Sequence, residues 1–134
     1  MRKRNSPAPA TFEKCAREII RLRDKTCQFW KGLIYDEIQG HHHLCQGQLE
    51  VAHLIPRGGH RNVRYDPDNL VLLCHFHHNI TLDRHPLDKD NWIRRYLGDL
   101  KWEALRAKDV LYIGKDADKR EEYAKLKAVL REMK

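Results

Sequence analysis

The sequence predicts a small α+β fold, and three observations support this prediction. Two short runs, 49–55 and 70–73, have the alternating or wholly apolar pattern of β-strands. Segments before and after them carry apolar residues at helical spacing. A chain of 134 residues, of which 41% are hydrophobic, suits one domain with a modest core. We therefore expect a single domain over residues 11–134, with its central part at about 25–86.

The N-terminal segment predicts a basic arm followed by a helix. Residues 1–10, MRKRNSPAPA, are expected to form a disordered arm. Thr11 can cap a helix over residues 12–24. The apolar stripe of this helix would consist of Phe12, Cys15, Ile19 and Leu22. Cys15 is therefore expected to be a buried structural thiol.

The C-terminal region, residues 90–134, predicts helices only. The first should begin at Asp90 or Asn91 and end at Gly98. A second would carry Trp102, and a charged third helix would span residues 116–134. At this spacing the aromatic side chains are expected in the core and not stacked on nucleic-acid bases.

The charge of the chain favours a polyanionic partner. The formal net charge is +7 and the pI is about 9.4, which favours nucleic acid over a membrane surface because the chain has no basic amphipathic anchor. An ordinary basic protein without such a partner is the alternative. No apolar run approaches the roughly 20 residues that span a bilayer, and the N-terminus lacks the apolar region of a signal peptide. We expect a cytoplasmic protein with no membrane association, and the sequence specifies no oligomeric state.

Metal ligation is the expected role of three of the four cysteines. Cys74 and His77 have the Cys-x-x-His spacing of zinc ligands. Cys27 and Cys45 lie in the irregular segment 25–48, which also contains three consecutive histidines, His41, His42 and His43. Adjacent residues cannot all face one ion, so at most one of these histidines is a candidate ligand.

Three polar residues of the central stretch suggest a catalytic site. His53 follows Leu49 and Val51 on one strand face, and its imidazole is suited to taking a proton from water at neutral pH. Asn69 precedes the second strand, and its amide could hold the His53 strand in place. His77 and His78 should point about 100° apart on a helix, so His78 would face the strands, where a cation could bind.

These residues resemble the HNH nucleases. His53, Asn69 and His78 match the three residues of the HNH motif, and the motifs AHLIPR, VRYDPDN, LVLLC and HFHH are similar to phage HNH proteins of the Rap/NinG recombination nuclease type. The segment NWIRRYLGDLKWEAL resembles the tail of that group, so that the resemblance covers about residues 25–106.

The resemblance implies a ββα-metal core with a structural zinc and flanking helices. It further implies a bacterial or phage-encoded DNA endonuclease that leaves 5′-phosphate and 3′-hydroxyl ends. His53 would be the general base, Asn69 an orienting residue and His78 a ligand of one Mg²⁺ or Mn²⁺ ion. Arg57, Arg61 and Arg64 are the expected phosphate contacts.

The sequence departs from the family pattern at two points. Many relatives carry a metal ligand immediately before the general base, where this chain has Ala52. Asp66 is the first candidate for the missing ligand, and Glu50 the second. Zinc-bearing relatives often begin with Cys-x-x-Cys, but here Trp30 stands in the second place. Cys45 would then complete a tetrahedral site, which consists of Cys27, Cys45, Cys74 and His77. The alternatives are that one of the histidines 41–43 replaces a cysteine, or that no zinc binds.

Two other functions remain open on the sequence. One is a catalytically degenerate zinc module that binds DNA or protein, in which Ala52 marks the lost site. The other is a general zinc-stabilised interaction protein.

Overall fold

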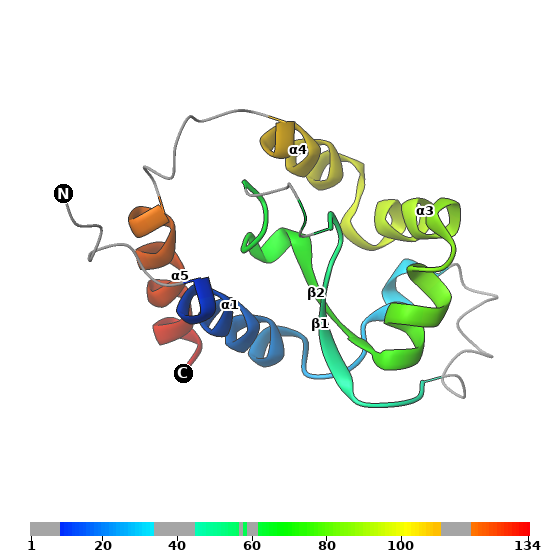
Figure 1. The fold of residues 1–134 in the computed structure, drawn as a ribbon, viewed down its shortest axis with the longest axis horizontal. Helices are drawn as coiled ribbons and strands as arrows, with labels where there is room; N and C mark the ends of the chain where they lie inside the picture. Colours follow the sequence, from blue (N-terminus) through cyan, green and yellow to red (C-terminus); the bar gives the residue numbers. More distant parts are fainter. Residues whose placement is uncertain (1–8, 34–44, 57, 59–61, 111–118) are drawn as a thin grey trace.

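The computed structural model describes residues 9–33, 45–56, 58, 62–110 and 119–134 and has a mixed α+β fold (Figure 1). Two antiparallel strands, β1 (Leu49–His53) and β2 (Leu70–Cys74), lie at its centre and are surrounded by helices. Their register pairs Leu49 with Cys74 and His53 with Leu70. The first strand is two residues shorter than its apolar run, because the chain turns away after His53.

The strand pair separates two hydrophobic cores. All five residues of β2 are buried, and successive side chains point to opposite faces. Val71 and Leu73 pack in a core with Trp92, whereas Leu70 and Leu72 pack in a second core. Strands of antiparallel sheets often alternate apolar and polar residues, because one face meets solvent. Here both faces of β2 are covered by a core, so all of its residues are apolar.

The N-terminal helix, α1 (Pro9–Asp24), starts earlier than Thr11. Proline is favoured in the first turn of a helix, since the N–H that it lacks would have no intrahelical partner. Phe12, Cys15 and Ile19 are buried as expected, but Leu22 is 37% exposed. The carboxylate of Asp24 at the end of α1 accepts a hydrogen bond from the backbone N–H of Leu72 (2.9 Å). Helix α1 thus packs on one face of the sheet and satisfies a backbone donor of β2.

Among the described residues, three short helical turns lie between the longer elements. They are the 3₁₀ turns η1 (Phe29–Gly32) and η3 (Pro67–Asn69) and the π-helical turn η4 (Phe76–Leu82) directly after β2. The predicted helical start after Cys74 is therefore present, but with wider turns than an α-helix.

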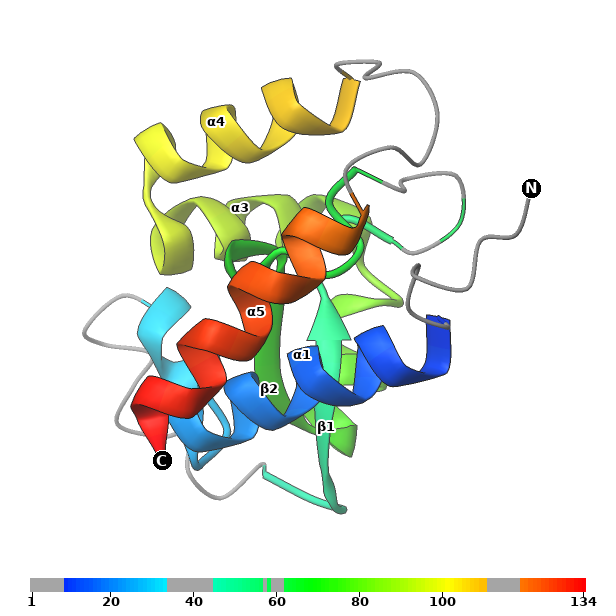
Figure 2. The same ribbon diagram turned by 90° about the vertical axis from the view of Figure 1, so that its left-hand side faces the viewer.

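Three helices complete the fold: α3 (Pro86–Leu97), α4 (Asp99–Val110) and α5 (Lys119–Met133). Helix α3 begins at Pro86, not at Asp90 or Asn91, and ends before Gly98 (φ +91°) as predicted. Figure 2 shows α5 lying across α1, and the two helices pack against each other. Within the described part of the chain, no helix has the length and apolarity needed to cross a membrane.

Candidate functional site

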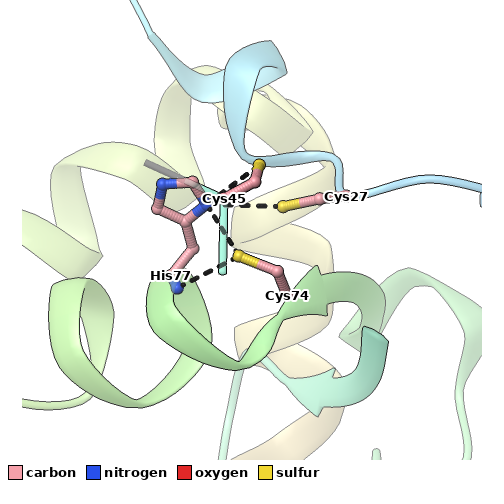
Figure 3. Close-up of side chains that lie close together, drawn as sticks. All are labelled: Cys27, Cys45, Cys74 and His77. Carbon is pink, nitrogen blue, oxygen red and sulfur yellow. Dashed lines mark hydrogen bonds between the residues drawn. The ribbon is translucent and has the colours of Figure 1, made fainter. Parts of the chain in front are cut away.

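Four side chains from distant parts of the chain meet at one end of the strand pair. They are Cys27, Cys45, Cys74 and His77 (Figure 3). Their ligand atoms all lie within 4.8 Å of one another. This Cys₃His cluster, which the sequence predicted, is able to hold a metal ion.

Backbone hydrogen bonds along β2 bring the cluster together. The N–H of Gln28 donates to the carbonyl of Leu72 (2.9 Å), which holds Cys27 beside the end of the strand. The N–H of Phe76 donates to the carbonyl of Gln46 (3.0 Å), which places Cys45 next to η4. Cys74 ends β2 and His77 lies in the first turn of η4.

The distances in the cluster fit a tetrahedral zinc site. Nδ1 of His77 lies 3.5, 3.7 and 3.2 Å from the Sγ atoms of Cys27, Cys45 and Cys74. In a tetrahedral site with ordinary zinc–sulfur and zinc–nitrogen bonds, the sulfur and nitrogen atoms lie about 3.5 Å apart. The three sulfur–nitrogen distances are therefore close to those of a tetrahedral zinc site.

Two of the clustered thiols, Cys27 and Cys45, resist ionisation without a cation. Burial, reinforced by the charges of Cys27 and Cys74, raises the pKa of Cys45 to about 12. Burial also raises the pKa of Cys27. Since thiolates are the metal-binding form, a divalent ion would supply the charge that offsets both effects.

An aromatic stack fixes the His77 ring. The ring of Phe29 lies 4.3 Å from it, centroid to centroid, and nearly parallel at 6°. Trp92 also stacks on Phe29 (5.6 Å, 7°), and its indole N–H donates to the carbonyl of Phe29 (2.8 Å). Gly32 permits this approach, because a Cβ atom there would lie 2.3 Å from the indole nitrogen. The cluster is thereby tied to η1 and α3.

Besides the Cys₃His cluster, a group of polar side chains surrounds Glu50 of β1. Its Oε1 lies 2.8 Å from Nδ1 of His78, and its Oε2 lies 2.9 Å from Nδ1 of His75. The side-chain amide of Asn79 also donates to Oε1 (3.0 Å). Partial burial raises the pKa of Glu50, but these three hydrogen bonds outweigh it and lower the pKa below its ordinary value. His77 and His78 thus face different groups, as expected for adjacent helical residues.

A cleft of about 790 Å³ lies beside this group. His53 from β1 and His78 from η4 both line it, together with Asp83 and Lys89. Arg17 of α1 lines it as well. The two histidines that the sequence singled out therefore line the same cleft.

Asn69 bonds to the chain that leaves β1. Its buried amide oxygen accepts from the N–H of Ile55 (2.6 Å), and its amide nitrogen donates to the carbonyls of Ile55 (3.2 Å) and Val63 (3.1 Å). The side chain thus fixes the backbone two residues beyond His53, in the manner expected of a positioning residue.

Asp66, the first sequence candidate for a cation ligand, is engaged elsewhere. One carboxylate oxygen caps η3 through the N–H of Asp68 (2.9 Å), and the other pairs with Lys108 of α4 (2.7 Å). Glu50, the second candidate, contacts His78. Arg64 is half-buried, and Arg57, Arg61 and the histidines 41–43 lie outside the described residues.

Sequence reasoning gave no weight to Asp83 or Lys89. Asp83 lies 3.6 Å from Nε2 of His78 (measured from Oδ2) and 3.3 Å from Nζ of Lys89 (measured from Oδ1). Its position depends on the geometry of the π turn, for which the sequence carries no recognisable signal.

Comparisons of the chain with family models, with curated proteins and with solved structures found no match in any of the three.

Proposed function

We propose that this protein is a metal-dependent DNA endonuclease of the HNH type. The observation that carries the proposal is that His53 and His78 line one cleft, one from the strand and the other from the helical turn of a strand–strand–helix unit. The sequence resemblance assigns a general base and a metal ligand to these two positions. A net charge of +7 is in keeping with a nucleic-acid substrate.

In this proposal, His53 accepts a proton from water, and the resulting hydroxide attacks the phosphorus of a phosphodiester. Asn69 positions the backbone beyond His53 through its bonds to Ile55. A divalent cation bound at His78 would stabilise the charge on the leaving 3′ oxygen. The products would carry 5′-phosphate and 3′-hydroxyl ends. Arg17 and Lys89, which line the cleft, join Arg57, Arg61 and Arg64 as candidate phosphate contacts.

The Cys₃His cluster would serve as a structural zinc site. It is a closed set of four protein ligands, as in structural sites, whereas a catalytic zinc keeps a position for water or substrate. The cluster ties the segments around Cys27 and Cys45 to the start of η4, from which His78 projects.

A plasmid-nicking assay with Mg²⁺ or Mn²⁺ tests the proposal. The wild-type protein should cut and EDTA should stop it. His53→Ala should lower the rate by about 10²- to 10⁴-fold, as for loss of a general base. His85→Ala is the matched control, because His85 is exposed and its side chain makes no cap hydrogen bond at the start of α3. Wild-type turnover by His53→Ala would contradict the proposal.

A non-catalytic zinc module that binds DNA is the second candidate. The observation that favours it is Ala52, which offers no ligand where many relatives have one. This function would be supported if the wild-type protein binds duplex DNA but cuts no DNA with any divalent ion.

A further inference from the structure

The π turn η4 brings Asp83 beside His78. The N–H of Asp83 donates to the carbonyl of His78 (3.2 Å), which is the five-residue hydrogen bond of a π-helix. In an α-helix the residue bonded in this way would be Leu82, whose side chain is buried in the core. The wider turn therefore lets Leu82 pack inside while the carboxylate of Asp83 lies next to His78.

Each ring nitrogen of His78 faces a different carboxylate. Nδ1 lies 2.8 Å from Glu50, at hydrogen-bond distance, whereas Nε2 lies 3.6 Å from Asp83, which is too far for a hydrogen bond. When Nδ1–H donates to Glu50, Nε2 carries the lone pair that can bind a cation, and Asp83 is the carboxylate beside this nitrogen. A carboxylate behind a histidine in this way is the usual arrangement for a metal-binding imidazole.

The gap between His78 and Asp83 has the width that a small cation requires. Two atoms that each lie about 2.1 Å from one Mg²⁺ ion are roughly 3.0 Å apart when adjacent and about 4.2 Å when opposite. The 3.6 Å separation of Nε2 and Oδ2 falls between these limits. Lys89 lies 3.3 Å from the other oxygen of Asp83 and so holds Oδ2 toward His78. The cleft leaves space for the water ligands that such ions retain.

We propose that His78 and Asp83 are the two protein ligands of a divalent cation of the Mg²⁺ or Mn²⁺ class, and that Glu50 orients the His78 ring from behind. The catalytic use of this cation rests on the proposed function, but its binding does not. Asp83 would supply the metal ligand that Ala52 cannot. Glu50 would then not be needed as a ligand and could keep its three hydrogen bonds.

Binding of Mn²⁺ to the zinc-loaded full chain tests the assignment without any nuclease assay. Electron paramagnetic resonance measures free Mn²⁺ during a titration. The wild-type protein should bind one ion, and Asp83→Asn should bind it at least about tenfold more weakly. Asp88→Asn is the matched control, since Asp88 is an exposed acid only five residues away. Equal affinity of the wild type and Asp83→Asn, or no Mn²⁺ binding by the wild type, would overturn the assignment.

A second measurement needs no variant. In wild-type protein with ¹⁵N-labelled histidine, substoichiometric Mn²⁺ should broaden the ring signals of His78 first, while those of exposed His85 persist. Broadening that spares His78 would overturn the proposal even if Asp83→Asn failed to fold.

The same proteins separate this proposal from the endonuclease function. If Mn²⁺ binds at His78 and Asp83 but the wild type cuts no DNA, the cation site stands and the endonuclease proposal fails. If the wild type cuts DNA and Asp83→Asn requires no more metal than the wild type, the endonuclease stands and the ligand assignment fails.

Discussion

Asn69 is a polar residue whose side chain bonds to the backbone inside the protein. It is fully buried and makes three hydrogen bonds to the backbone of Ile55 and Val63. Water cannot replace the Asn69 side chain at these backbone groups unless the loop opens. Loss of the hydrogen bonds is therefore costly. Loss of the Asn69 side chain is therefore expected to destabilise the protein.

Asn69→Ala should lower the free energy of unfolding by about 2–4 kcal/mol, because it leaves the buried N–H of Ile55 without its acceptor and removes one donor each from the carbonyls of Ile55 and Val63. The Val63 carbonyl keeps its bond from the N–H of Asp66 (3.1 Å). Urea denaturation would measure the change. Asn91→Ala, at an exposed position of α3, is the control and should differ from the wild type by no more than about 0.5 kcal/mol. Similar values for the two variants would mean that the bonds of Asn69 are readily replaced.

At the scale of single elements, η1 depends on one glycine. Gly32 lies against Trp92, which is buried and stacked on Phe29. Any side chain at this position must displace the indole or the turn. Because Phe29 in turn stacks on His77, a shift here would reach the Cys₃His cluster.

Gly32→Ala should therefore destabilise the protein by about 1–3 kcal/mol, the usual cost of overpacking a core. Gly58→Ala provides the control, because a Cβ atom at Gly58 would meet no atom within 4 Å. Thermal unfolding followed by circular dichroism compares the two. An unchanged midpoint for Gly32→Ala would show that Trp92 moves at little cost.

The elements also show what sequence patterns could and could not predict. Spacing within one element was sufficient for β2, for the Cys74–His77 pair and for the end of α3 at Gly98. The starts of α1 and α3 were placed too late, because Pro9 and Pro86 precede the polar residues chosen as caps. No local pattern specifies two of the contacts near the candidate site. Asp66 pairs with Lys108 through the packing of distant segments. Asp83 approaches His78 because of the π turn.

At the scale of the whole molecule, the Cys₃His cluster joins three segments that lie far apart in the sequence. Cys27 follows α1, Cys45 precedes β1, and Cys74 and His77 bracket the end of β2. A bound zinc ion would close these segments into one unit, and its binding free energy would then contribute to folding.

Purified protein should thus contain about one zinc ion per chain. Cys74→Ser should lose this zinc and much of its helical circular dichroism signal. Cys15→Ser is the matched control, since Cys15 is also buried but lies outside the cluster, and it should retain zinc. Elemental analysis measures the ion. A well-folded wild-type protein without zinc would refute the structural role.

The central position of β2 between two cores has a consequence for how the native state opens. The amides of β2 can reach solvent only when packing on both of its faces is lost. In α5, by contrast, Leu126 alone is buried among the side chains that the structure describes. In hydrogen–deuterium exchange, α5 should therefore lose protection through local opening, and β2 should exchange last, near the limit of global unfolding. The strand that carries Cys74 into the cluster would then be the slowest-exchanging part of the protein, and the helix packed on α1 one of the fastest.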